Sequence, residues 1–316
     1  MLNKICYILI KKIIRFIKYL NLDQTVFDKL IFCIGINQLT SCRQNYKNFG
    51  SLHEAELKIF SQNGEDGIID YLIHQLGVPF PNFVEIGIGN YRESNTRFLY
   101  NRIHSKGLII DRLDQLHAKV KPYVNLWKGD LRIHQEIVTT ENISNILNKY
   151  CDFEIDLFSI DIDGIDYWVI LKLKPNISKI FVAEYNPVFG SDLEITVPNI
   201  SGFDRTNYHY SNLCYGTSLK ALIKLMEEKN YYFLGTNLQK NNAFFISNNL
   251  KKESFFPNIN LQKLSYYSDS NIRDSRDRNY NLNYLRGNKK LKEIEECKVI
   301  NLAGNKNIVT KIKDLL

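Results

Sequence analysis

The sequence predicts an α/β protein built on a doubly wound, mostly parallel sheet of seven strands with helices on both faces. Short apolar runs alternate with helical segments, as in repeated strand–helix–strand units. The run 82–86 leads into Gly87 and Gly89, a pattern typical of a buried strand that turns sharply into a helix. A second run, 107–111, ends in Asp111 about 24 residues after Gly87, an interval that suits one such unit.

Acids follow several of the predicted strands. The third strand is expected to end at Asp130, and the fourth to lead into Asp161 and Asp163. Open parallel sheets bind ligands at the carboxyl ends of their strands, so these acids are expected to face a site. The predicted strands cover residues 82–86, 107–111, the segment ending at 127–130, 156–160, 179–184, 231–235 and 243–246.

Length and composition indicate one large α/β domain with extensions. The chain has 316 residues, of which 44% are hydrophobic and 24% charged, as in folded globular proteins. Its six cysteines include no C-x-x-C pair, so the sequence favours neither a zinc knuckle nor a disulfide framework. A reducing cytoplasm is the simplest compartment.

The net charge of +7 is unevenly distributed. Residues 1–50 carry 8 Lys/Arg and 2 acids, residues 51–250 carry 19 and 24, and residues 251–316 carry 14 and 8. We therefore divide the chain into a basic amphipathic amino-terminal extension, a central domain and a basic, irregular carboxyl-terminal extension. Because phosphate binding needs clustered Lys/Arg, the acidic central segment argues against a nucleic-acid partner.

Residues 1–20 have the pattern of a basic amphipathic helix. Lysines interrupt it too often for a transmembrane span, and the apolar run after Lys4 is too short for a signal peptide. Two interpretations stay open: packing on the protein's own domain, which we favour, or peripheral contact with anionic lipid at the inner face of the membrane. The apolar side is formed by Ile10, Ile13, Ile14, Ile17 and Leu20, and Lys11, Lys12, Arg15 and Lys18 lie between them.

The glycine loop lacks a feature that dinucleotide sites need. Their third glycine would stand at position 92, which is Arg92 here. Glu85 would repel a pyrophosphate but suits an ammonium or a hydroxyl, and Asp111 can accept the hydroxyls of an adenosine ribose. Acid-x-Gly-x-Gly is the pattern of S-adenosylmethionine sites.

A polar loop, residues 60–67, precedes the first strand and can fold over the mouth of the site. We assign Gln62 in this loop to cofactor binding. The loop is equally well explained as a helix cap, with Asn63 or Asp66 accepting from free backbone amides.

Together these segments resemble class I S-adenosylmethionine-dependent methyltransferases with a Rossmann-like fold, and more narrowly a bacterial FkbM-like group. The resemblance spans roughly residues 58–248 and leaves both basic flanks unexplained. It is carried by residues 61–67 (SQNGEDG), 84–87 (VEIG), 159–168 (SIDIDGIDYW), 184–187 (EYNP) and 241–245 (NNAFF).

The resemblance implies S-adenosylmethionine as the cofactor. Glu85, Gly87 and Gly89 would line its methionine and ribose side, Asp111 would bind the ribose hydroxyls, and Asp130 would lie near the adenine. Asp161 would lie near the transferring methyl group. By analogy with this group, the acceptor is expected to be a sugar hydroxyl or a related small molecule in glycan biosynthesis.

An alcohol acceptor loses its proton as it attacks, so a nearby base is expected. The candidates are His209, in a long aromatic loop, and Asp163; a hydrogen-bonded loop histidine is the simpler interpretation of His209. Asp161 and Asp163 could alternatively bind Mg²⁺, but no third ligand is evident, and we predict no metal. A non-catalytic protein that binds a nucleotide or a partner is the competing hypothesis.

Overall fold

The computed structural model describes residue 12 and residues 24–250, 262–268, 274–305 and 307–316. The basic amphipathic segment predicted for residues 1–20 lies outside the described residues, except for the exposed Lys12.

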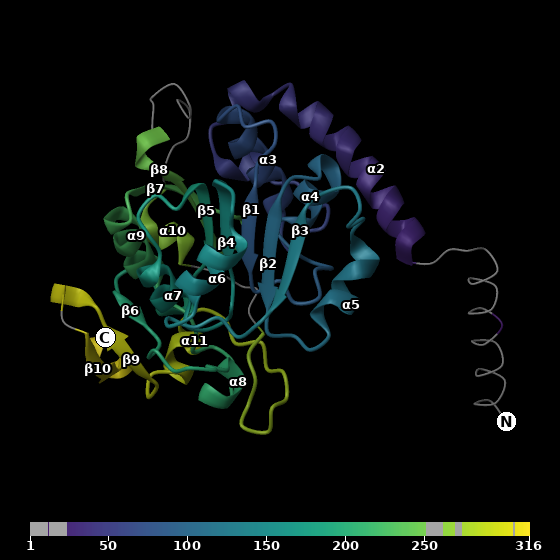
Figure 1. The fold of residues 1–316 in the computed structure, drawn as a ribbon. Coiled ribbons are helices and arrows are strands. Elements are labelled where there is room, and N and C mark those ends of the chain that lie inside the picture. Colours follow the sequence, from purple (N-terminus) through teal and green to yellow (C-terminus); the bar gives the residue numbers. More distant parts are fainter. Residues whose placement is uncertain (1–11, 13–23, 251–261, 269–273, 306) are drawn as a thin grey trace.

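The described chain contains a sheet of seven strands in the order β3-β2-β1-β4-β5-β8-β7 (Figure 1). All neighbours from β3 to β5 pair in parallel, whereas β8 is antiparallel to both β5 and β7. The predicted mostly parallel, seven-stranded sheet is therefore confirmed. Its strands are β1 Phe83–Ile86, β2 Gly107–Asp111, β3 Leu131–Gln135, β4 Ile155–Ile160, β5 Ser178–Glu184, β7 Tyr231–Thr236 and β8 Asn242–Ser247.

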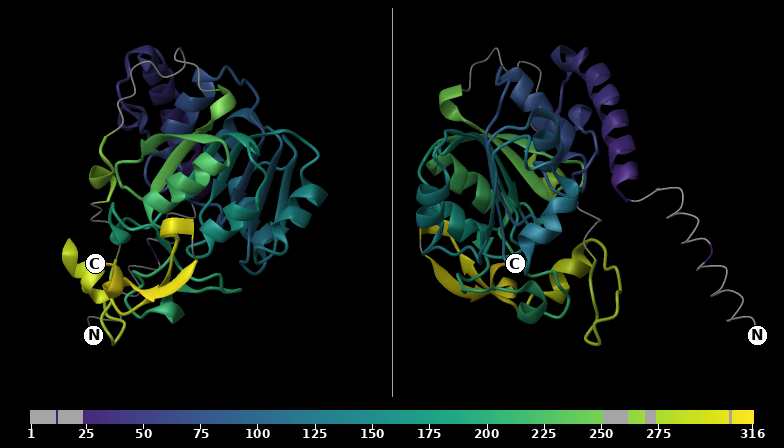
Figure 2. Two further views of the ribbon diagram at one scale, coloured as in Figure 1. Left: turned by 90° about the vertical axis from the view of Figure 1, so that its left-hand side faces the viewer. Right: turned by 45° about the vertical axis from the view of Figure 1, so that its right-hand side comes forward.

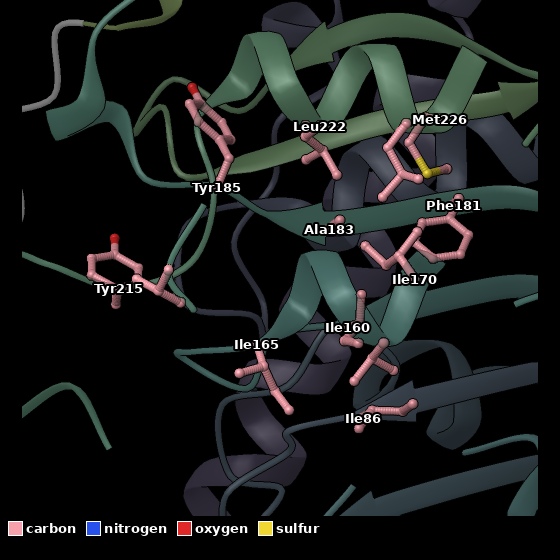
Figure 3. Close-up of a cluster of buried hydrophobic side chains, with 14 of the residues drawn as sticks. Ile86, Ile160, Ile165, Ile170, Phe181, Ala183, Tyr185, Tyr215, Leu222 and Met226 are labelled. Carbon is pink, nitrogen blue, oxygen red and sulfur yellow. The ribbon is translucent and has the colours of Figure 1, made fainter. Parts of the chain in front are cut away.

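Helices cover both faces of this sheet, because alternate strand residues point to opposite sides and both sides are apolar. On one face, Phe83 and Leu157 pack with α3, α4 and α5. On the other, Ile86 and Ile160 pack with α6, α7 and α9 (Figure 3). These helices are α3 Glu65–Gln75, α4 Arg97–Ile103, α5 Leu116–Val120, α6 Ile143–Tyr150, α7 Asp166–Lys172 and α9 Leu219–Glu228.

The carboxyl-terminal segment forms a second, antiparallel sheet with part of the central domain. Its strands β9 (Lys298–Asn301) and β10 (Ile308–Lys311) pair with each other, and β9 also pairs with β6 (Ile195–Thr196). Figure 2 shows these strands, in yellow, beside the main sheet. Val299 and Ile312 are fully buried in the main core. The expected irregular extension is therefore wrong here, because the apolar residues 299, 300 and 302 give the segment side chains to bury on both of its faces.

Helix α2 (Gln24–Arg43) lies along the outer edge of the domain (Figure 1). Two ion pairs attach it: Asp28 pairs with Arg97, and Arg43 pairs with Asp70. Among the described residues, no helix is both long and apolar enough to cross a membrane. The remaining short helices are α8 Arg205–Tyr208, α10 Leu264–Tyr267 and α11 Asn288–Glu293, and the 3₁₀ turns are η1 Tyr46–Asn48, η2 Leu52–Ala55, η3 Lys121–Tyr123, η4 Pro187–Phe189, η5 Asn248–Leu250, η6 Ala303–Asn305 and η7 Ile312–Leu315.

Candidate functional site

A cavity of about 560 Å³ opens at the carboxyl ends of β1, β2, β3 and β4. It lies where the strand order reverses between β1 and β4, the position at which doubly wound sheets bind ligands. Its volume falls within the range of roughly 300–1,000 Å³ typical of small-molecule sites. Ile86 and Ile165, both labelled in Figure 3, contribute apolar lining. Seven of the nine sequence-predicted site residues line this cavity: Gln62, Glu85, Gly87, Gly89, Asp111, Asp161 and Asp163.

Gly87 and Gly89, the two glycines of the first loop, are required at their positions for different structural reasons. Both adopt positive φ, +85° at Gly87 and +54° at Gly89. A Cβ atom at Gly87 would stand 1.6 Å from the Asp161 carbonyl oxygen, whereas one at Gly89 would meet no atom within 4 Å. The close approach at Gly87 is therefore to β4, not to a ligand as the sequence suggested, and Gly89 is the glycine whose open side lines the cavity.

Asp111 fixes the loop that contains Gly89. The Gly89 amide donates to Oδ2 of Asp111 at 2.7 Å, and the Leu113 amide donates to Oδ1 at 2.8 Å. Each carboxylate oxygen has two lone pairs, so each can accept one further hydrogen bond. Asp111 is thus held in place while keeping acceptor capacity toward the cavity.

Glu85 also lines the cavity, but its carboxylate is largely engaged by the protein. Ser94 Oγ donates to it at 2.6 Å, the Asn95 amide at 2.9 Å, and the Thr96 amide at 3.0 Å. Burial raises the pKa of the Glu85 carboxyl, and the hydrogen bonds from Ser94 and Thr96 oppose this shift. Glu85 therefore anchors the segment that leads into α4 and borders the cavity at the same time.

Asp130 does not lie at the site. Strand β3 begins at Leu131, which pairs with Gly107 at the first position of β2, so Asp130 precedes the strand and stands at the opposite edge of the sheet. Its carboxylate pairs with Arg132. The predicted third strand lies too early in the chain, and the residues that follow the end of β3, 136–138, line the cavity instead. A polar residue after an alternating run is the signal that would have identified Glu136.

A second cavity of about 270 Å³ adjoins the first and shares Gln62, Asp161 and Asp163 with it. Arg205, on α8, forms an ion pair with Asp163 there. Asp163 has φ +54°, a conformation that a non-glycine residue rarely adopts and that clusters at functional sites. The other lining residues are Asn63, Glu184, Pro187, Tyr215, Asn241 and Asp274.

Three carboxylates converge where the two cavities meet. Oxygen atoms of Asp161, Asp163 and Glu184 lie within 4.8 Å of one another. Glu184 ends β5 as Asp161 follows β4, so both acids stand at the carboxyl ends of adjacent parallel strands. Glu184 and Arg205 were not predicted as site residues, although Glu184, like Asp161, is an acid at the end of a predicted strand.

His209 lines neither cavity. Its Nδ1 lies 2.7 Å from Ser211 Oγ, and its ring packs against Tyr210 with centroids 4.3 Å apart. Burial lowers the pKa of the imidazole. The prediction of His209 as a base is therefore wrong in position: the aromatic loop turns this side chain toward its own neighbours, and Arg205 of the same loop reaches the site.

Buried polar residues hold the loops around the cavities. Asp66 accepts from the backbone amides of residues 59, 60 and 61 at 2.6–2.8 Å, which fixes the segment leading to Gln62. Glu65 accepts from the side chains of Asn237 and Asn242, both at 2.8 Å. The motif of residues 61–67 is thus mainly a scaffold that fixes the segment carrying Gln62 at the mouth of both cavities.

Asp166 plays the corresponding role after β4. Its carboxylate accepts from the Ile162 amide at 2.9 Å and from the Gly164 amide at 3.0 Å. Burial raises the pKa of the Asp166 carboxyl to about 6 against these opposing backbone hydrogen bonds. The turn that presents Asp163 is therefore fixed from within.

The fold and the site define an α/β protein with a small-molecule site at the switch point of its sheet. No protein-family model and no curated protein matches the sequence. Among solved structures, the chain is similar to an S-adenosylmethionine-dependent methyltransferase from Clostridium acetobutylicum, with a TM-score of 0.39 and 10% identity over 58% of this chain and 90% of that chain. It is also similar to a precorrin-6y C5,15-methyltransferase from Geobacter metallireducens, with a TM-score of 0.32 and 13% identity over 61% and 94%. The fold assignment itself rests on the strand order and pairing given above.

Proposed function

We propose that this protein transfers a methyl group from S-adenosylmethionine to a hydroxyl oxygen of a sugar or a related small molecule. The observation that carries the proposal is the pair of adjoining cavities that share Gln62, Asp161 and Asp163. A larger cavity at the switch point suits a nucleoside cofactor, and a smaller polar cavity beside it suits an acceptor.

The residues of the larger cavity fit this cofactor. Asp111 retains acceptor capacity for the two ribose hydroxyls, and Ile137 and Val138 offer apolar surface for the adenine. The cavity carries more acids than bases, because Glu85, Glu93, Asp111, Glu136, Asp161 and Asp163 line it against Arg92 and Arg112. An acidic cavity favours a cationic sulfonium ligand and disfavours a pyrophosphate.

When bound, S-adenosylmethionine supplies a methyl group on a positively charged sulfur, which leaves as a neutral thioether when the acceptor oxygen takes the methyl. The protein's task is to align the acceptor and to receive its proton. Asp161 borders both cavities and is the carboxylate we assign to that proton. Asp163 is neutralised by Arg205 and is assigned to positioning.

The second cavity favours a polyhydroxylated acceptor. Carboxylates and side-chain amides dominate its lining, and these groups accept hydrogen bonds from hydroxyl donors. A sugar hydroxyl in a glycan or its precursor therefore remains the substrate class that we propose.

Binding and turnover test the proposal separately. Calorimetry on the full chain should show binding of S-adenosylmethionine and S-adenosylhomocysteine, with NAD as the matched negative control. Incubation with a panel of sugars and nucleotide sugars, followed by mass spectrometry, should then reveal a product heavier by one CH₂ group. Absence of cofactor binding would refute the function. Binding without product across hydroxyl and amine acceptors would support the non-catalytic alternative.

The three converging carboxylates also favour a second mechanism, in which Mg²⁺ bound by Asp161, Asp163 and Glu184 orients the acceptor oxygen. We still expect no metal requirement, because Arg205 already supplies a positive charge to Asp163. Turnover should therefore be unchanged by a chelator. Loss of turnover in the chelator and its recovery with Mg²⁺ would establish the metal mechanism instead.

A further inference from the structure

Helix α2 has two apolar faces, and one of them packs on the domain. Leu39 is buried with Ile59, Phe60 and Phe98, and Phe32 and Ile36 pack against the same cluster. This contact attaches α2 to the segment that leads into Gln62. The packed face therefore contains three apolar side chains of α2: Phe32, Ile36 and Leu39.

The second apolar face of α2 points away from the domain. Its side chains are 48%, 53%, 42% and 57% exposed at Phe27, Leu30, Ile31 and Ile34. Their spacing of three, four and seven residues puts them on one side of the helix. Figure 2 shows α2 as the outermost described helix on its side of the molecule. A continuous apolar patch of this kind marks an interaction surface.

The charges around this face are positive. Residues 1–23, which lead into α2, contain five Lys/Arg and one acid, Asp23. Lys29 on α2 is exposed. Lys119, which precedes η3, and Lys121, which is part of it, are also exposed, and η3 contacts α2. The acid of the same helix, Asp28, is paired with Arg97. An apolar stripe surrounded by basic residues is complementary to a surface whose outer layer is negatively charged and whose interior is apolar.

We propose that the outer face of α2 docks on an anionic lipid surface. Phe27, Leu30, Ile31 and Ile34 enter the boundary between headgroups and acyl chains, and Lys29, Lys119 and Lys121 contact lipid phosphates. A lipid surface is favoured over a protein partner because the chain offers diffuse positive charge and large aliphatic side chains here. This inference goes beyond methyl transfer and does not depend on it.

Vesicle sedimentation with the full chain tests the proposal. Wild-type protein should sediment with phosphatidylcholine vesicles that contain phosphatidylglycerol and remain in solution with phosphatidylcholine alone. Raising the salt concentration should weaken binding, because salt screens exposed charges. The variant Leu30→Gln/Ile34→Gln should bind roughly tenfold more weakly or worse, since two aliphatic side chains no longer enter the lipid.

The matched control is Asn37→Gln/Thr40→Gln, which introduces two glutamines at exposed polar positions of the same helix. It should bind vesicles like wild type, and both variants should keep the wild-type melting temperature. Replacing Lys29, Lys119 and Lys121 by Gln should abolish the preference for anionic vesicles.

Three results would overturn the proposal. In the first, the wild-type protein fails to sediment with anionic vesicles, or Leu30→Gln/Ile34→Gln sediments as well as wild type. In the second, this variant lowers the melting temperature, which would mean that the chain's own first residues cover the face. In the third, light scattering shows a dimer that the variant dissociates, without vesicle binding, which would identify a second copy as the occupant.

Discussion

The Gly89 amide donates a 2.7 Å hydrogen bond to the Asp111 carboxylate. This bond joins the loop after β1 to the end of β2, two segments that both line the larger cavity. The acid that the sequence identified as a ribose ligand thus also shapes the glycine loop beside it. Its removal therefore affects the site in two ways, through a lost ligand contact and through a looser loop.

Asp111→Ala is expected to weaken S-adenosylmethionine binding by about 1–3 kcal/mol, through loss of charge-assisted hydrogen bonds to the ribose. Calorimetry on both proteins measures this difference. Asp114→Ala is the matched control, because Asp114 is an exposed acid three residues away that does not line the cavity. Equal affinities of wild type and Asp111→Ala would show that Asp111 does not bind the cofactor.

The two loop glycines are expected to respond differently to alanine. Gly89→Ala should cost about 1–2 kcal/mol of stability, for a left-handed residue with a Cβ, and should weaken cofactor binding because the methyl group enters the cavity. Gly87→Ala should cost at least about 3 kcal/mol, since its Cβ also collides with the Asp161 carbonyl. Urea unfolding compares the two free energies of unfolding. A Gly87→Ala protein as stable as Gly89→Ala would contradict this account of β1 and β4.

Asp161→Asn should reduce methyl transfer by about 10²-fold or more, because the amide cannot take the acceptor's proton. His209→Ala should leave turnover unchanged, since the imidazole lines neither cavity. The comparison uses kcat and KM for an identified acceptor, with cofactor affinity measured in parallel. Full activity of Asp161→Asn, or a pH-dependent loss of turnover in His209→Ala, would show that the base lies in the aromatic loop and not after β4.

The buried Asp66 is expected to make stability depend on pH. Burial raises the pKa of its carboxyl from 3.8 to about 6, against opposing hydrogen bonds from the backbone and Ser61. The folded state then binds this proton more tightly than the unfolded state, so the free energy of unfolding should fall as pH rises from about 4 to about 6. The contribution of this residue is on the order of 3 kcal/mol.

Asp66→Asn should remove that part of the slope while keeping an oxygen that accepts from the same three amides. Asp66→Ala should instead destabilise the protein at all pH values, because three backbone donors lose their partner. Urea titrations of the three proteins at about pH 4, 5, 6 and 7, which span the raised pKa of Asp66, measure both effects. A slope in Asp66→Asn identical to that of wild type would contradict the assignment.

Several parts of the fold and site followed from local sequence. Apolar runs with glycine and acid ends located six of the seven strands of the main sheet, because a strand buried on both faces needs a continuous apolar run. The predicted third strand ended at Asp130, before β3 begins. The acids at 111, 161 and 163 were located correctly for the same reason, since residues that directly follow such a run reach the carboxyl edge of the sheet.

Only the tertiary structure decided the rest, because those features depend on contacts between residues far apart in the chain. The register of β3 on β2 places Asp130 outside the site. The sequence of β3 is too polar to determine that register by itself. Arg205 contacts Asp163, although the two residues are 42 positions apart in the sequence. Arg205, and not His209 of the same loop, is therefore the residue that reaches the site. Strand β9 of the basic carboxyl-terminal segment pairs with β6, which attaches that segment to the central domain. Local propensity determines where a strand forms, whereas long-range packing determines what its ends meet.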